Sequence, residues 1–423
     1  MKFRADYILT QENQLSFKLL QNQYVEVDER GKFSQITAYT NQEVTTHFKN
    51  LLIPGLTNAH SHGFQLAMRG KGDNPENFRD WVNRYLYPEV ESLNESRLRS
   101  ILSKLFKLML ENGITTLGEF HYFHHNTPRD FAFDQIMLEE AKKAGIRLSL
   151  LSSAYDLGSR DAQKRFHSSP EQFITSLERV ETWLNENDLS DDWALSVAPH
   201  SLHGCSPELI QASVAWAEER NLKWHIHLSE QEEDLPFSQK KFGTTPLRAL
   251  HSILGDLLTN NACLVHGCWL TDSELELFTE KCINLIYNPF TNMYLGDGIT
   301  KTSHMDFTRS KIALGTDSNN AFNMFTEAKL FECLQRVNRL EMGVINSHHL
   351  FSSITSFGGD LLNLPVGKIQ KDFFADFLEI NLQQTVDEAP SEMSVETLLN
   401  HLIFSGLDRS SISARYIGGK QIL

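Results

Sequence analysis

The sequence predicts an α/β fold: a (β/α)8 TIM-like barrel with a small β-sandwich domain formed by both chain ends. Apolar segments of strand length alternate with segments of helical period through the middle of the chain, and β-type segments gather at its two ends. No GxGxxG or P-loop motif marks a doubly wound nucleotide-binding sheet. The 423 residues, 41% of them hydrophobic and 22% charged, suit one large barrel with a small satellite domain.

The two chain ends are expected to meet in the β-sandwich. Residues 1–53 contain three β-type runs separated by polar turns, at 5–10, 22–29 and 33–40. Residues 366–423 contain two more, at 373–382 and 412–423. The barrel is therefore expected to occupy residues 54–365.

The middle of the chain repeats a strand and then a helix. Apolar positions at helical spacing predict helices at 95–112, 134–144, 170–188 and 206–220. Short apolar runs predict buried strands at 50–60, 114–125, 146–155, 193–201, 222–230, 262–270, 283–290 and 311–319. The repeat has roughly the number of units that a closed barrel needs.

Charge and cysteine usage narrow the class of partner. A formal net charge of −15 disfavours nucleic acid, which requires clustered Lys and Arg. No apolar run approaches the ~20 residues of a membrane-spanning helix, and MKFRADYILT lacks the apolar core of a secretory signal. The five scattered cysteines fit reduced thiols. We therefore expect a cytoplasmic protein whose partner is a small-molecule substrate, with no nucleic acid and no membrane.

Polar side chains of only a few types close five of the predicted strands: His60 with His62, His200, His227 with Glu230, His266, and Asp317. In a parallel barrel the carboxyl ends of all strands meet at one face. Side chains spread over more than half of the chain can therefore converge on one site.

The HxH pair is the first element of this site. With a side-chain period of two, His60 and His62 point to the same side of an extended chain and can bind one metal ion. Two loop histidines without a ligand role are an equally good reading of HxH alone. His225 and His227 also share a side, so the sequence leaves open which of them is the ligand.

Carboxylates complete the pattern. Glu230, three residues after His227, can take a proton from water and deliver it to a leaving nitrogen, although a glutamate opening the next helix is the plainer alternative. Asp317 ends an apolar strand, where a buried carboxylate needs a metal or a partner unless it caps the following helix. His266 is expected either at the site or as a core histidine bonded to the backbone.

The histidines at 121, 124 and 125 form a second dense group. We interpret them as a non-metal cluster, because no carboxylate pattern accompanies them along the sequence.

The motifs HxH, HxxE, His and Asp occur in this order, each at a strand end. Chance is a poor explanation for the coincidence of all four. At IPGLTNAHSH, APHS, HIHLSEQ, LVHG and GTDSN the chain resembles the amidohydrolase superfamily, in its mononuclear aminohydrolase branch. Within that branch it is most similar to the formimidoylglutamate deiminase family, through HSHGFQLAMRG, GEFHYFHHN, APHSL, HIHLSEQEED and LGDGI.

The resemblance implies a zinc-dependent hydrolase acting on C–N bonds, a deiminase or deaminase. Water would attack an sp² carbon of a C=N group, and ammonia would leave. One Zn²⁺ per chain is expected, with Fe²⁺ or Mn²⁺ as acceptable substitutes, and a homodimer is expected by family analogy. The implied metal ligands are His60, His62, His227 and Asp317; the implied catalytic residues are Glu230, His266 and Asp317; and the implied substrate contacts are Gln65, Tyr122, His200 and His203.

The resemblance implies the type of reaction but leaves several substrates open. His203 stands where the deiminase has an arginine that grips a substrate carboxylate, and histidine is a weaker, titratable replacement. Arg69, Arg79 and Arg84 are candidates for the missing cation. The segment FRDWVNRYLYPEV is closer to nucleobase and halotriazine aminohydrolases. N-formimino-L-glutamate is thus one candidate, a nucleobase, pterin or halotriazine substrate is the alternative, and a non-catalytic binding barrel is a remote third.

Overall fold

The computed structural model describes residues 1–422 apart from 14, 73–74, 128–129 and 303–304. Within this part of the chain, eight parallel strands form two halves of a barrel, in the orders β5-β6-β7-β8 and β12-β11-β10-β9. A parallel bridge between Ser61 and Asp317 closes one seam, and at the other the His227 amide donates to the His200 carbonyl at 3.1 Å. The barrel strands are β5 (Leu56–Ser61), β6 (Ile114–His121), β7 (Arg147–Ser152), β8 (Ala194–Val197), β9 (Trp224–Leu228), β10 (Ala262–His266), β11 (Asn284–Tyr287) and β12 (Ile312–Leu314).

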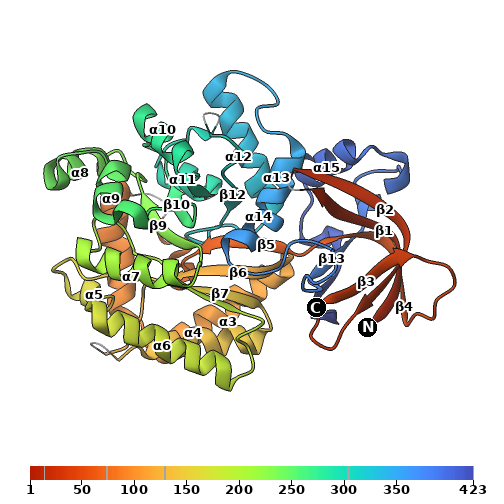
Figure 1. Ribbon diagram of the computed structural model, residues 1–423, viewed down its shortest axis with the longest axis horizontal. Coiled ribbons are helices and arrows are strands. Elements are labelled where there is room, and N and C mark those ends of the chain that lie inside the picture. The colour runs from red at the N-terminus through yellow and green to blue at the C-terminus, as the bar shows by residue number, and fades with distance from the viewer. Residues whose placement is uncertain (14, 73–74, 128–129, 303–304, 423) are drawn as a thin grey trace.

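Helices follow the strands and form the outer layer (Figure 1). Eight carry most of it: α3 (Glu95–Glu111), α4 (Ala132–Ala144), α6 (Pro170–Glu186), α7 (Pro207–Glu219), α9 (Pro246–Leu254), α10 (Asp272–Glu280), α11 (Pro289–Leu295) and α12 (Met324–Arg339). In α3, Leu98, Leu102, Leu105 and Met109 are buried at helical spacing, and the Asn94 side chain caps the first turn. This alternation confirms the predicted (β/α)8 barrel.

Shorter helices fill the loops and the outer edge. In the connections after the barrel strands, at the carboxyl face, lie η1 (Gly63–Met68), α1 (Phe78–Trp81), the π-helical turn η2 (Val82–Leu86), α2 (Tyr87–Ser92), α5 (Asp161–Lys164) and α8 (Asp234–Phe242), whereas η3 (Gly255–Leu257) leads from α9 into β10. Later in the chain come α13 (Ser347–Ser353), α14 (Ser356–Leu361), η5 (Leu382–Gln384), η6 (Pro390–Glu392), α15 (Val395–Phe404) and η7 (Arg409–Ser411).

Both chain ends enter one seven-stranded sheet, ordered β15-β14-β13-β4-β1-β2-β3. Its strands are β1 (Lys2–Asn13), β2 (Ser16–Val27), β3 (Phe33–Ala38), β4 (Thr46–Pro54), β13 (Phe377–Ile380), β14 (Ile412–Ile417) and β15 (Lys420–Gln421). The antiparallel pairing of β4 with β13 joins the two ends. Phe3, Phe48, Phe377 and Tyr416 pack together in the core of this sheet domain, with ring centroids 4.5–5.8 Å apart.

The strand expected at 50–60 proved to be two strands. β4 ends at Pro54 in the end sheet, and β5 begins at Leu56 in the barrel. Gly55 separates them where the backbone passes Thr115 closely, because a Cβ there would lie 2.2 Å from the Thr115 hydroxyl oxygen. A continuous apolar run conceals this change of sheet.

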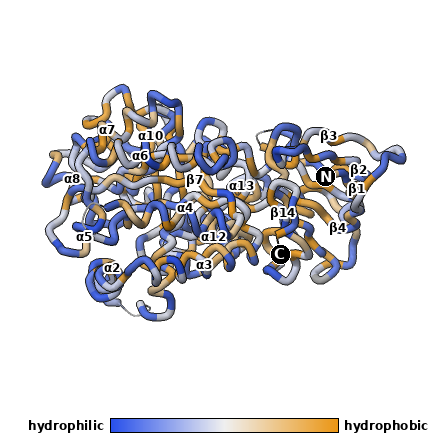
Figure 2. Tube along the Cα trace, turned by 90° about the horizontal axis from the view of Figure 1, so that it is seen from below, coloured by the Kyte–Doolittle hydropathy of each residue, from blue (hydrophilic) through white to orange (hydrophobic). Residues whose placement is uncertain are grey.

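Apolar residues concentrate inside the barrel and within the end-sheet domain, and polar residues lie on the loops (Figure 2). No helix in the described part of the chain combines the length and apolar character needed to span a membrane.

Candidate functional site

A pocket of about 490 Å³ opens at the carboxyl ends of the barrel strands. Its floor includes His62, His227, Glu230, His266 and Asp317, which come from four separate segments of the chain. Its wall includes aromatic side chains from the three connections that follow β5, β6 and β7: Phe78, Trp81, Tyr87, Tyr122, Tyr155 and Phe166. The predicted convergence of strand ends therefore occurs.

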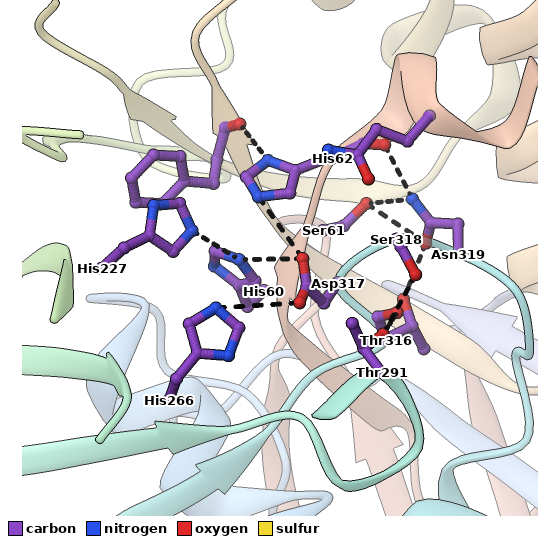
Figure 3. A network of polar contacts seen from close by, with 12 residues as sticks. His60, Ser61, His62, His227, His266, Thr291, Thr316, Asp317, Ser318 and Asn319 are labelled. Atoms are coloured by element: carbon purple, nitrogen blue, oxygen red, sulfur yellow. Dashed lines mark hydrogen bonds and ion pairs between the residues drawn. The ribbon is translucent and has the colours of Figure 1, made fainter. Parts of the chain in front are cut away.

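Four side chains converge at the bottom of this pocket (Figure 3). The Nε2 atoms of His60 and His62 lie 3.5 and 3.4 Å from Oδ1 of Asp317. The Nε2 atoms of His60 and His227 lie 3.2 Å apart. All four residues are at most 6% exposed. Three imidazoles and one carboxylate at this spacing form a donor set suited to one divalent cation.

Backbone carbonyls fix two of these imidazoles. The Nδ1–H of His62 donates to the Phe120 carbonyl at 3.0 Å, and the Nδ1–H of His227 donates to the His200 carbonyl at 3.0 Å. Their Nε2 lone pairs consequently face the centre, as in metal-ligating histidines.

Burial keeps the imidazoles neutral. Desolvation lowers the pKa of His60 to about 3 and lowers the pKa of His227 well below its usual value. Neutral rings crowded around a carboxylate, with the Nε2 atoms of His60 and His227 in contact, fit a cation that accepts their lone pairs.

Asp317 stands in a tightly specified loop. Burial alone would raise the pKa of its carboxyl, but the hydrogen bond with His60 and the neighbouring imidazoles lower it below the usual range. Its amide donates to the His60 carbonyl at 2.9 Å, and its carbonyl accepts from the His62 amide at 2.9 Å. Asn319 strengthens this tie by donating to the Ser61 hydroxyl and the His62 carbonyl, each at 3.0 Å (Figure 3). The loops after β5 and β12 thus behave as one unit.

Glu230 and His266 lie beside the four donors. His266 Nε2 is 3.7 Å from Glu230 Oε1 and 3.8 Å from Asp317 Oδ2. Burial, with the charges of Asp317 and Asp234, raises the pKa of Glu230 well above its usual value. A carboxyl group of this kind can hold a proton near neutral pH and give it up again.

The backbone is strained at two site residues and at the residue before Glu230. Ser229, His266 and Asp317 have φ values of 52°, 74° and 48°, in the left-handed region that residues with a Cβ rarely adopt. Each lies just beyond or at the end of a barrel strand. Such strain is concentrated where a site requires an exact side-chain direction.

Of His225 and His227, the structure places only His227 at the pocket. His227 faces the pocket, whereas His225 lies deeper and donates from Nε2 to the Leu361 carbonyl at 3.0 Å. Both share one side of β9, as the period of two predicts.

The four predicted substrate contacts all line the pocket. The Gln65 amide donates to the Tyr122 hydroxyl at 3.1 Å, and His200 packs against Tyr122 with ring centroids 5.2 Å apart. His203 lies further out, its side chain 45% exposed, where Nε2 contacts Asp234 at 2.6 Å.

Two arginines also reach the pocket. Arg79 and Arg160 line its mouth, and the Arg160 guanidinium lies 5.0 Å from the centre of the Tyr87 ring. Of the other candidates, Arg69 packs over Phe322 and Arg84 pairs with Asp80. Sequence reasoning missed Arg160, because it stands in a polar loop with no motif, eight residues after the end of β7.

A carboxylate does accompany the second histidine group, contrary to our sequence-based interpretation. Asp134 of α4 lies 2.9 Å from His121 Nε2 and 2.7 Å from His124 Nδ1. His124 Nε2 also contacts the Ser153 carbonyl at 2.7 Å, so both of its ring nitrogens face acceptors. Burial opposes a charge on this ring, but Asp134 and the carbonyl raise the pKa of His124. The group is therefore best described as a buried imidazolium–carboxylate pair.

A closed parallel barrel with histidine and carboxylate donors at its carboxyl ends defines a class of barrel enzymes that use a metal. The sequence profile of the amidohydrolase family matches residues 51–422. The chain belongs to the amidohydrolase family.

Known relatives agree with this assignment. The chain is 30% identical over 360 residues to a 5'-deoxyadenosine deaminase of Methanosphaera stadtmanae, covering 84% of this chain and 79% of that one. It is 27% identical over 416 residues to a 5-methylthioadenosine/S-adenosylhomocysteine deaminase of Thermococcus sibiricus, covering 95% and 89%. The fold matches that of an adenosine deaminase from Xanthomonas campestris with bound zinc, at a TM-score of 0.84 and 19% identity over 99% and 92% of the chains. The specific similarity to formimidoylglutamate deiminase stays a prediction.

Proposed function

We propose that this protein is a metal-dependent aminohydrolase that uses water to release ammonia from a carbon doubly bonded to nitrogen. One observation carries the proposal. Four metal-type donors and a separate carboxyl group, Glu230, face the floor of a single pocket. The deaminase names of its relatives support the same reaction.

The donor residues would be His60, His62, His227 and Asp317. Three neutral imidazoles and one carboxylate suit Zn²⁺, our first choice, and Fe²⁺ or Mn²⁺ would accept the same donors. A divalent metal ion, when bound, lowers the pKa of water from about 15.7 toward 7 and so supplies the nucleophile at neutral pH.

Glu230 and His266 would handle the proton and the developing charge. Glu230 takes a proton from the attacking water and passes it to the leaving nitrogen, a role that its raised pKa suits. His266 donates a hydrogen bond toward the oxygen that adds to the substrate carbon. Asp317 orients the attacking water, accepts its second proton and returns it to a substrate nitrogen, so that both protons of the water end in the products. The C–N bond then breaks, and ammonia leaves.

The proposed substrate is a 6-aminopurine nucleoside. The aromatic side chains of the pocket wall suit a planar heterocycle, and both relatives named above are deaminases of adenosine derivatives. Gln65, Tyr122 and His200 would contact the ring nearest the metal ligands, and His203 would contact the outer part of the substrate.

An acidic imine such as N-formimino-L-glutamate is the second candidate. Arg79 and Arg160 lie at the mouth of the pocket, where their guanidinium groups would attract a substrate carboxylate. His203 could add a third polar contact there.

The test is an ammonia-release assay with zinc-loaded protein. The panel holds adenosine, 5'-deoxyadenosine, 5'-methylthioadenosine, guanine, a pterin, a halotriazine and N-formimino-L-glutamate. We expect turnover of one or more adenosine derivatives. Turnover of N-formimino-L-glutamate alone would favour the second candidate. A protein that releases ammonia from none of these substrates would contradict the aminohydrolase proposal.

A further inference from the structure

His266 is held from behind by Asn292, a residue of α11 buried outside the pocket. The amide Nδ2 of Asn292 lies 2.8 Å from Nδ1 of His266 and 2.8 Å from Oδ2 of Asp297. All three side chains are at most 1% exposed. An amide nitrogen carries two hydrogens and only donates, so one hydrogen serves each neighbour.

We propose that Asn292 sets the tautomer of His266. A ring Nδ1 that accepts a hydrogen bond carries no proton, so in the neutral ring the proton resides on Nε2. Nε2 is the atom that faces Glu230 and Asp317 at 3.7 and 3.8 Å. Asn292 is thus a positioning residue that presents an N–H of His266 to the reacting centre. This inference rests on the proposed function for its consequence in turnover, although the tautomer itself does not depend on it.

The opposite orientation of the Asn292 amide is less favourable. With nitrogen and oxygen exchanged, the oxygen would accept from His266 and would require a proton on Asp297. Burial raises the pKa of Asp297 to about 8, so that proton alone does not decide between the orientations. The exchanged orientation would require protons on both Asp297 and Nδ1 of His266, whereas the observed one requires neither and leaves only the Oδ1 of Asn292 without a partner among the described residues.

Asp297 is itself anchored. Its carboxylate accepts from the Gln231 side chain, and its backbone carbonyl accepts from Trp269 Nε1 at 2.7 Å. Its amide donates to the Asn292 carbonyl at 2.9 Å. The chain from the Asp297 loop through Asn292 to His266 therefore consists of groups that each have a fixed partner.

Nitrogen-15 NMR of the unmodified protein tests the tautomer directly. Zinc-loaded, ¹⁵N-histidine-labelled protein is compared with His266→Gln to assign the ring signals of His266. We expect a protonated Nε2 and an unprotonated Nδ1. A proton on Nδ1 with a bare Nε2 would overturn the proposal, whether or not the protein turns over any substrate.

Variants test the consequence. Asn292→Asp removes the amide donor and places carboxyl oxygens beside Nδ1 of His266 and Oδ2 of Asp297, so the ring is no longer held in the single Nε2–H tautomer. We expect kcat to fall by about 10–100-fold, with KM and zinc content unchanged. Asn292→Ala removes the hydrogen-bond donor to Nδ1 without putting an acceptor in its place, so its kcat should fall less than that of Asn292→Asp. Met293→Ala, 48% exposed on the same helix, is the matched control.

A wild-type kcat in folded Asn292→Asp would contradict the proposal. If the substitution prevents folding, the NMR measurement still decides. If the wild-type protein releases no ammonia, the proposed function fails, and the tautomer result stands apart from that failure.

Discussion

The rings of His62 and His227 are each oriented by one backbone carbonyl. Phe120 and His200 supply these acceptors. Phe120 lies on β6, the neighbour of β5, and His200 lies just after β8, beside β9. Since an imidazole with Nδ1–H committed to a carbonyl can offer only Nε2 to a metal, the barrel backbone selects the ligand atom. The donor set thus depends on strand register as much as on the histidines.

Loss of a single imidazole should weaken metal binding. His62→Ala removes one of the four proposed donors, so we expect zinc affinity to fall by more than the ~10–100-fold that an outer partner of a ligand costs. Chelator competition and elemental analysis measure the change. His47→Ala, which removes a half-exposed histidine on the end sheet, controls for adventitious binding. Unchanged zinc stoichiometry and affinity in His62→Ala would remove His62 from the ligand set.

The sequence predicted the site residues that lie at strand ends. HxH, HxxE and Asp317 could be predicted, because strand periodicity fixes which side chains share a side and parallel strands end at one face. Arg160, Asn292 and Asp134 could not. Each acts through a contact across space, and local periodicity carries no signal of such a contact.

At the scale of elements, one buried pair ties a helix to two strands. Asp134 stands in the first turn of α4, His121 ends β6, and His124 reaches the Ser153 carbonyl just after β7. A buried carboxylate shared by two imidazoles leaves little freedom for α4 to slide along the barrel. We infer that the pair stabilises this side of the barrel wall.

Asp134→Asn should destabilise the protein and change its pH dependence. Removing one partner of a buried pair typically costs about 3–5 kcal/mol. The raised pKa of His124 means that its contribution is complete below its unfolded pKa of about 6.5 and is lost as the pH rises through the folded value. The lowered pKa of Asp134 means that its contribution is lost at acid pH. The advantage of the wild type should therefore be greatest between about pH 4 and 6.5.

Chemical unfolding of both proteins at pH 6 and pH 9 measures this difference. Asp161→Asn, which changes an exposed carboxylate paired with Lys164, is the control and should shift stability by less than about 0.5 kcal/mol. An Asp134→Asn protein as stable as the wild type at pH 6 would show that the pair contributes nothing.

At the scale of the whole molecule, the end sheet and the barrel meet through a buried ion pair. Arg147 at the start of β7 donates from Nε and Nη2 to the two carboxylate oxygens of Asp376, at 2.7 and 3.1 Å. Its guanidinium also lies 3.6 Å from the centre of the Phe374 ring. A planar, bidentate pair stacked on an aromatic ring gives the joint a defined geometry.

The sequence predicted the general architecture, but it did not predict where the end sheet gives way to the barrel. Alternating strand and helix segments predicted the barrel, and β-type segments at both ends predicted a joint domain. Leu52 and Leu56 lie in one apolar run, yet they belong to different sheets. Hydrophobicity reports burial and not the sheet that supplies the partner strand, so the change appears only in the structure, where β4 pairs with β13 and β5 pairs with β6.

The central claim is that a metal-binding set and a separate proton-carrying carboxyl group share one pocket. Zinc content and ammonia release, measured together in the wild type and in Glu230→Gln, test it most directly, with the exposed neighbour Glu232→Gln as control. The account predicts that Glu230→Gln binds zinc like the wild type and loses about 10²–10⁴-fold in turnover. A zinc-replete Glu230→Gln protein that releases ammonia at the wild-type rate would contradict it.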